Sequence, residues 1–143
     1  MGVRVKIKII SRSTGKQVIT SALVNSGFES DKPQLLIPRK LAEELGLWPP
    51  TVTTSMEYKT TAGPVYLITI SDELEVYIVT HDKEKGPFVC DAVISTIEDE
   101  VLINDQLGEL LGIIILGLSS GKWKFIDDPP DKIRTSESPQ YWR

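Results

Sequence analysis

Histidine and cysteine, two residue types common in nucleophilic and metal-dependent sites, are rare in this chain. His81 and Cys90 are the single histidine and the single cysteine of the chain. Cys90 lies in the run Phe-Val-Cys-Asp-Ala-Val, where we expect a small buried apolar residue and not a nucleophile. His81 lies in the turn-like stretch His-Asp-Lys-Glu-Lys, which we expect to be a solvated turn and not a metal or catalytic site. We therefore predict no metal site and no cofactor.

Aspartates near the C-terminus could suggest a site for a divalent cation. Asp127, Asp128 and Asp131 offer carboxylate oxygens, but their spacing lacks the glycine turn and the later glutamate of a calcium loop. Together with the prolines among them they indicate a solvated, irregular tail over residues 127–143. Tyr141 and Trp142 are the part of this tail that could dock on the body of the protein.

Charge and hydropathy exclude two classes of partner. The chain has 20 acidic and 16 basic residues, so its formal net charge is −4, with both signs mixed along the sequence. Neutralising phosphates needs clustered lysine and arginine, so we predict no nucleic-acid binding. The longest apolar run, residues 113–118, is far shorter than the roughly 20 residues of a membrane-crossing helix. A lone cysteine also fits a reducing compartment, and we expect a cytoplasmic protein without a membrane partner.

The periodicity of the chain predicts one mainly β domain over residues 1–126. Apolar residues alternate with charged ones from Val3 to Ile9, as in a strand with one face on a core. Pro38 is expected at the first position of a short helix that Gly46 ends, and a second short helix is expected over residues 105–111. Further strands are expected over residues 17–24, 35–37, 51–58, 65–71, 74–80, 88–94, 102–103, 113–118 and 122–126.

The chain contains an internal repeat. Residues 36–47 and 102–113 are identical at six of twelve positions with a constant offset of 66. Similar apolar stretches precede both copies, Ala-Leu-Val-Asn-Ser over 22–26 and Ala-Val-Ile-Ser-Thr over 92–96. The repeat predicts two related halves, each a strand, a loop, a short strand and a short helix, around a pseudo-two-fold axis.

One stretch resembles a known family. The apolar strand ending in Ala-Leu-Val-Asn-Ser-Gly-Phe, then Leu-Leu-Ile-Pro and a helix closing in Leu-Gly-Leu, resembles the retropepsin-like aspartic proteases, especially the microbial single-domain members. The second half, with Val-Leu-Ile-Asn over 101–104 before a helix and Leu-Gly-Ile, is similar to a later element of that family. The similarity covers residues 3–126 in order and spacing.

The resemblance implies a retropepsin-like acid-protease fold, a closed or strongly curved β domain with two short helices. Asn25, Ser26 and Gly27 would form the active-site loop, with Asn25 at the position of the catalytic aspartate. Because the second half carries Ser95 at the equivalent position, a complete site would require a C2 homodimer. The Ser26 hydroxyl would bond across the two loops, and Gly27 would permit the tight backbone there.

The resemblance also implies a peptide cleft. The hairpin turn at residues 59–64 would be a flap over it, and Phe28, Thr61, Ala62 and Gly63 would contact the substrate. An extended peptide suits such a cleft because its main chain can add a strand while alternating pockets select side chains.

Two departures from the family change the expected activity. The family's catalysis needs two facing carboxylates that share a proton, and the amide of Asn25 can neither donate nor accept that proton. Asn104 replaces the family's usual glycine, which puts the close packing of that segment in doubt. Asn25 could reflect a natural loss of catalysis, an introduced substitution, or an ordinary Asx turn.

We therefore expect an inactive, aspartic-protease-like homodimer that binds a peptide or protein in its cleft. One alternative is an active aspartic endopeptidase, if the natural residue at position 25 is aspartate. The other is a structural or assembly dimer that has kept only the interface.

Overall fold

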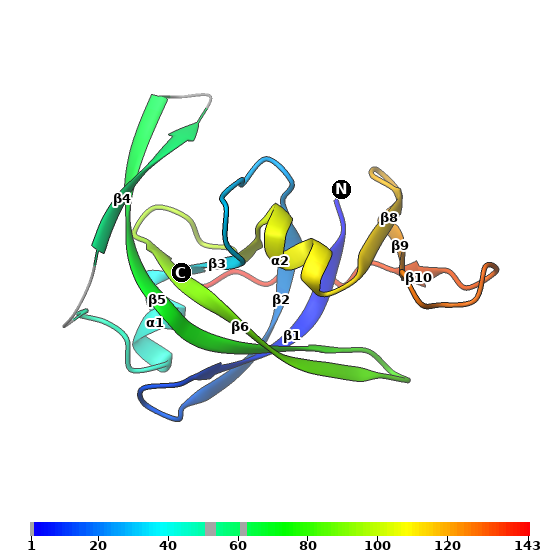
Figure 1. Cartoon of the computed structure of the whole chain (residues 1–143), viewed down its shortest axis with the longest axis horizontal. Coiled ribbons are helices and arrows are strands. Elements are labelled where there is room, and N and C mark those ends of the chain that lie inside the picture. The colour runs from blue at the N-terminus through cyan, green and yellow to red at the C-terminus, as the bar shows by residue number, and fades with distance from the viewer. Residues whose placement is uncertain (1, 51–53, 61–62) are drawn as a thin grey trace.

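A computed structural model describes residues 2–50, 54–60 and 63–143, with side chains described outside residues 51–66. Its centre is a barrel of six strands that closes where the first strand pairs with the fifth (Figure 1). In order round the barrel they are β1 (Arg4–Ser11), β2 (Gln17–Val24), β7 (Leu102–Ile103), β3 (Gln34–Pro38), β6 (Glu84–Ser95) and β5 (Gly63–Val79). No helix in these ranges is long and apolar enough to cross a membrane. The mainly β prediction is confirmed.

Strand β1 shows why the alternating pattern forms a barrel wall. Val5, Ile7 and Ile9 point into the core and are buried, whereas Lys6 between them is exposed. A strand places successive side chains on opposite faces, so this pattern gives one dry and one wet face. β1 pairs with β2 on one side and with β5 on the other, and the second pairing closes the sheet.

The two halves of the chain exchange strands. β2 pairs in parallel with β7, and β3 pairs in parallel with β6. Leu23 lies opposite Leu102, while Val93 lies opposite Leu36. Leu23 and Val93 are equivalent in the repeat, as are Leu102 and Leu36, so one pairing is the copy of the other. The equivalent register supports an internal duplication.

The two short helices also follow the repeat. α1 (Arg39–Glu44) and α2 (Asp105–Leu110) begin 66 residues apart, and each is followed by a glycine with positive φ, Gly46 at 75° and Gly112 at 78°. Each copy is thus a strand followed by a helix, as the repeat predicts. Pro38 is the N-cap of α1 and ends β3, so the helix begins one residue later than expected.

One strand differs from the prediction. Residues 65–71 and 74–80 were expected to form separate strands, but β5 is continuous and bends at a bulge between Ile70 and Leu74. Asp72 takes a positive φ of 51° there, a conformation that aspartate tolerates better than most residues. Its backbone N–H donates to Asp91 Oδ1 at 2.9 Å. The bulge bends the strand without breaking it.

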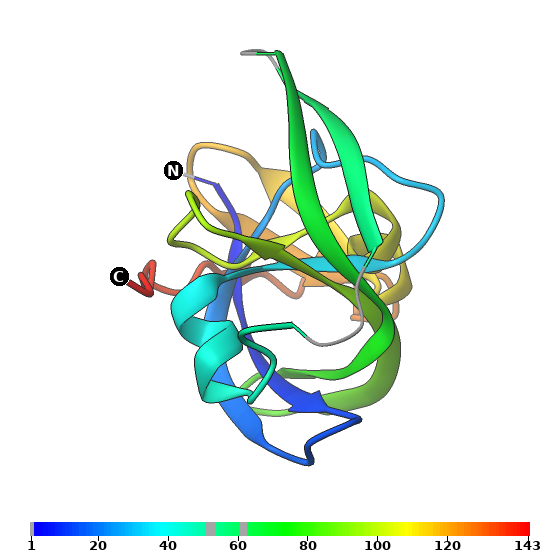
Figure 2. The same ribbon diagram turned by 90° about the vertical axis from the view of Figure 1, so that its left-hand side faces the viewer.

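A hairpin extends the sheet beyond the barrel. β4 (Thr54–Thr60) pairs with the first part of β5, with Thr60 opposite Gly63, which confirms the predicted hairpin. β6 pairs with β5 only from Ile68 onward, so the outer part of β5 pairs with β4 alone. Figures 1 and 2 show this hairpin rising at the end of the barrel that carries the 25–33 loop.

The C-terminal third forms a small second sheet beside the barrel, in the order β10-β9-β8 (Figure 1). Its strands are β8 (Ile113–Gly117), β9 (Lys122–Phe125) and β10 (Arg134–Thr135). Trp142 packs against the core, and its Nε1 donates to Thr20 Oγ1 at 3.0 Å. The end of the chain therefore docks on the body.

The expectation that Asp128 is a solvated side chain is wrong. Asp128 is buried, and the cost of burying its charge is offset because Arg134 Nε donates to its Oδ2 at 2.8 Å and Lys83 Nζ lies 3.1 Å from its Oδ1. The hydrogen bond from Arg134 lowers the pKa of this carboxyl group. Asp127 is exposed, as expected.

Candidate functional site

The Asn25 loop begins where β2 ends and is held by backbone bonds at both ends. The Asn25 N–H donates to the carbonyl of Ile103 in β7 at 2.9 Å. The Phe28 N–H donates to the Asn25 carbonyl at 3.1 Å, and the Phe28 carbonyl accepts from the N–H of Asp105 in α2 at 3.1 Å. The loop from Asn25 to Phe28 is therefore fixed against the second half of the chain.

The side chain of Asn25 forms an Asx turn. Its Oδ1 accepts a hydrogen bond from the Gly27 N–H at 3.1 Å. Within the described part of the chain, Asn25 Nδ2 has no acceptor. Asn25 is half-buried, whereas Ser26 and Gly27 are exposed. The loop therefore presents an amide nitrogen beside an exposed, small-residue backbone.

Ser95 occupies the equivalent position of the second half and makes the equivalent turn. Its Oγ accepts from the N–H groups of Ile97 at 3.2 Å and Glu98 at 3.0 Å. Unlike Asn25, Ser95 is completely buried. Its hydroxyl group serves the fold and is not accessible to a ligand.

Asn104, which the sequence suggested as a possible packing defect, joins the segment of residues 30–34 to α2 through its side-chain hydrogen bonds. Its Oδ1 accepts from Gln34 N–H at 3.0 Å and from Leu107 N–H at 2.9 Å, which caps α2. Its Nδ2 donates to Ser30 Oγ at 3.2 Å and to the Lys32 carbonyl at 2.9 Å. All four bonding positions of a completely buried amide are filled. Asn104 is thus a structural residue that closes the loop.

A buried carboxylate ties the same loop to the bend of β5. Asp91 Oδ1 lies 3.0 Å from Lys32 Nζ and accepts from the Asp72 N–H, while its Oδ2 accepts from Gln34 Nε2 at 3.1 Å. Burial alone would raise the pKa of Asp91, but these three donors outweigh burial and lower the pKa. The hydrogen bond to Asp91 raises the pKa of Lys32. Sequence reasoning missed this group, although a charge inside the apolar run Phe-Val-Cys-Asp-Ala-Val was a visible signal.

A groove of about 430 Å³ lies beside the Asn25 loop. Its lining includes Val24 of β2, Ser26 of the loop, Gly108 of α2, Ile114 of β8 and Ile126. Ile126 is one of the most exposed apolar residues in the described part of the chain, at 71%, and Ile114 is also exposed. The groove is therefore apolar, open and continuous with the candidate loop.

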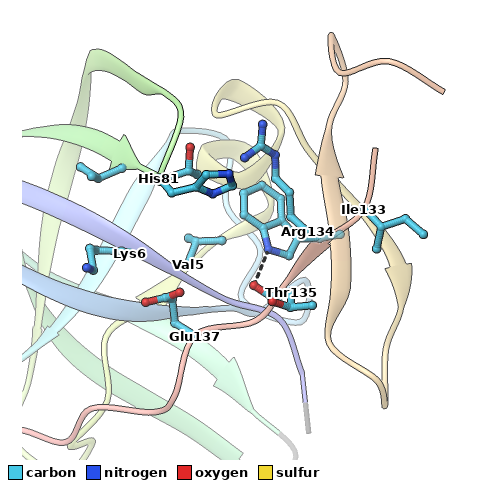
Figure 3. A pocket seen from close by; sticks show the side chains of 10 residues that line it. Val5, Lys6, His81, Ile133, Arg134, Thr135 and Glu137 are labelled. Atoms are coloured by element: carbon cyan, nitrogen blue, oxygen red, sulfur yellow. Dashed lines mark hydrogen bonds between the residues drawn. The ribbon is translucent and has the colours of Figure 1, made fainter. Parts of the chain in front are cut away.

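A second cavity, of about 350 Å³, lies between the barrel and the C-terminal segment. Figure 3 shows Lys6, His81 and Glu137 around it. Arg134 also lines it, but its guanidinium group is engaged by both oxygens of Asp82 at 2.7 and 3.1 Å and by Asp128. The buried cation of this second cavity, Arg134, is therefore already paired within the fold. For this reason we assign the candidate site to the groove beside the Asn25 loop.

The predicted site residues fall into two groups. Asn25, Ser26, Gly27 and Phe28 lie in one loop. Gly63 opens β5 in the protruding hairpin, and Thr61 and Ala62 lie outside the described residues.

Cys90 is completely buried, and burial raises the pKa of its thiol. This agrees with its interpretation as a core residue. Among the described residues, no three histidine, cysteine, aspartate or glutamate side chains gather as a metal site would require. No protein-family model matches the chain, and a search of the curated proteins found no match.

Proposed function

We propose that this chain is a non-catalytic protein of the retropepsin-like aspartic-protease kind, which forms a C2 homodimer and binds an extended peptide segment beneath its β4–β5 hairpin. The observation that carries the proposal is the exchange of strands between the halves. It sets Asn25 and Ser95 at equivalent strand ends, each with a side-chain oxygen that accepts from the N–H two residues on. One half thus carries an accessible polar group and the other does not.

The surface beside the Asn25 loop supports a homodimer. β8 is an edge strand, because no strand in the described ranges pairs with its second edge. Its outward side chains are Ile114 and Leu116, and Leu110 and Ile126 nearby are also exposed. An uncharged, apolar edge strand is usually covered in a native protein, and two copies paired about a two-fold axis would cover it.

The chemistry of the loop supports binding without cleavage. An aspartic protease needs a carboxyl group that donates a proton and a carboxylate that activates water. The amide of Asn25 does not titrate, and Ser95 in the second half is buried behind its own turn. A peptide bound at the Asn25 loop would therefore remain intact.

Sedimentation velocity tests the dimer. The native chain is expected to sediment as a dimer, and Leu116→Arg as a folded monomer, because a charge on β8 must be desolvated in the interface. Ile133→Arg is the matched control, since Ile133 is a similarly exposed apolar residue outside β8. A native chain that is monomeric at high concentration would contradict the homodimer.

Binding is tested with a labelled unfolded protein, reduced and carboxyamidomethylated ribonuclease A. The native dimer should increase its fluorescence anisotropy, while electrophoresis should show no cleavage from acid to neutral pH. Cleavage that pepstatin inhibits, with Asn25 intact by mass spectrometry, would instead make the chain an endopeptidase. A dimer that does not bind the probe would favour the assembly role.

A further inference from the structure

The second cavity, between the barrel and the C-terminal segment, shares no lining residue with the groove beside the Asn25 loop. Its volume of about 350 Å³ falls within the range of about 300–1,000 Å³ that is usual for small-molecule sites. Apolar and charged side chains from both layers line it together (Figure 3), among them Val79, Ile133, Lys6 and Glu137. The cavity therefore suits a small ligand with an apolar body and a polar end.

The walls of this cavity are held by bonds that need no ligand. Trp123 Nε1 donates to the Thr135 carbonyl at 3.3 Å, and the Glu137 N–H donates to the Arg4 carbonyl at 2.8 Å. The side chain of Arg134 is 4% exposed and is held by two carboxylate groups. Because these walls are already ordered, a ligand that enters pays little for fixing them.

The outward basic residues of β1 differ in whether they are paired. Arg4 Nε lies 2.5 Å from a carboxylate oxygen of Glu100. Lys8 Nζ lies 3.0 Å from Glu84 Oε1. Lys6 lies between them on the same face of the strand, is exposed and lines the cavity, and no described residue is its acidic partner. The cavity thus contains the lysine whose charge the fold leaves unbalanced.

Glu137 lines the same cavity from the C-terminal segment and is also exposed. Within the described part of the chain its carboxylate forms no ion pair or hydrogen bond, so it is not paired with Lys6 either. The cavity therefore presents one available positive charge and one available negative charge. Both lie beside an apolar wall to which Val79 and Ile133 contribute.

We propose that this cavity binds a free α-amino acid with an apolar or aromatic side chain. The carboxylate of the ligand accepts from Lys6 Nζ, and its ammonium group donates to the carboxylate of Glu137. The side chain of the ligand packs against Trp123 and Ile133. The inference does not rest on the proposed function, because the groove and this cavity have no lining residue in common.

The charges of the lining disfavour other small ligands. A phosphate-bearing ligand needs free cations, but Arg134 is already bonded to carboxylates and Glu137 would repel the phosphate. A simple cation would be repelled by Lys6. An uncharged apolar ligand would desolvate both charges and give them no partner, which is costly.

Isothermal titration calorimetry of the native chain with L-phenylalanine tests the site. We expect saturable binding with a Kd of about 1 mM or below. Phenethylamine lacks the carboxylate and 3-phenylpropionate lacks the ammonium group, so each should bind at least roughly tenfold more weakly. L-Phenylalanine should also shift the Trp123 indole N–H resonance, since this side chain lines the cavity.

Two variants assign each charge of the ligand to its partner. Lys6→Gln should weaken L-phenylalanine roughly tenfold and leave phenethylamine unchanged, while Glu137→Gln should weaken L-phenylalanine similarly and leave 3-phenylpropionate unchanged. Lys8→Gln is the matched control, because Lys8 lies on the same face of β1 and does not line the cavity. It should bind L-phenylalanine as the native chain does. Melting temperatures verify that all three variants are folded.

Three outcomes would overturn the inference. The first is no saturable binding of L-phenylalanine up to about 10 mM. The second is equal affinity for 3-phenylpropionate, which would make the ligand a simple anion. The third is unchanged affinity in folded Lys6→Gln and Glu137→Gln, which would place the ligand elsewhere. Peptide binding by the dimer, measured with unfolded ribonuclease A, stands or falls separately from all three.

Discussion

The two asparagines of the chain follow the ends of two paired strands, β2 and β7, and they differ in the number of hydrogen bonds that their side-chain amides form. Asn104 is completely buried and has four side-chain hydrogen bonds. Asn25 is half-buried, bonds one oxygen to Gly27 and leaves its nitrogen without a described partner. A saturated buried amide belongs to the fold, whereas a partly used amide beside an exposed loop is available to a ligand. Residue type alone does not separate these roles, but the hydrogen-bond count does.

Asn104→Ala is expected to show the largest effect, because it tests the structural side of the comparison. It removes the cap of α2 and leaves the buried Gln34 N–H without its acceptor, at a combined cost of about 3 kcal/mol in the free energy of unfolding. Urea denaturation measures this loss. A cost below about 1 kcal/mol would mean that water replaces the amide and that Asn104 is not the anchor of the loop.

Ser95→Ala should have the next largest effect. The hydroxyl group accepts from two backbone N–H groups at a completely buried position, so its removal should cost about 1–2 kcal/mol. Urea denaturation and amide hydrogen exchange at Ile97 and Glu98 should report the same local loosening. Unchanged exchange at both amides would show that this turn does not depend on its hydroxyl group.

Lys32→Met tests whether the ion pair helps to hold the Asn25 loop, and its effect should depend on pH. Near pH 7 we expect a loss of about 1 kcal/mol, since Lys32 is partly exposed and Asp91 keeps its other two donors. The lowered pKa of Asp91 means that its stabilisation is complete above the unfolded-state value of about 3.9 and is lost as the pH falls further.

The raised pKa of Lys32 sets the upper end of the pH range in which this ion pair stabilises the fold. Its stabilisation is complete below its ordinary pKa of 10.5 and is lost as the pH rises through the raised value. The difference in stability between the native chain and Lys32→Met should therefore be greatest between about pH 4 and 10 and should vanish in acid. A difference that persists at pH 2 would point to lost packing of the lysine stem instead.

Asn25→Ala should have the smallest effect on stability, below about 0.5 kcal/mol, because only one half-exposed turn bond is lost. Urea denaturation of Asn25→Ala and Asn104→Ala under the same conditions compares their free energies of unfolding directly. If the two alanine variants lose similar stability, both asparagines are structural and the Asn25 amide is not available to a ligand.

Local pattern predicted the elements well, because the alternation of Val5, Ile7 and Ile9 and the glycines after both helices act over short distances along the chain. The repeat went further and predicted which strand-and-helix units are equivalent. What it did not predict was that the halves exchange strands, because that requires knowing the partner of each strand. The continuity of β5 was missed since Asp72 resembles a turn residue and acts as a bulge.

The side-chain network of the site could be predicted only in part. Asn25 was found through the motif around it. Asn104 was noticed as a departure from a family pattern, but its four partners come from Ser30 to Gln34 and from α2, which the sequence does not bring together. Asp128 was misread because its partner Arg134 becomes close only when β10 pairs with β9.

The exchange of strands also bears on how the chain folds during synthesis. β3 has β6 and β7 as its two neighbours, and both belong to the second half. Leu23 and Leu102 are about 80 residues apart, so their pairing closes a long loop and gives the barrel a high contact order. Until residue 84 and beyond leave the ribosome, β3 has no strand to pair with and exposes an apolar edge. The nascent first half is therefore the species most in need of chaperone protection, and the barrel forms as one late, cooperative unit.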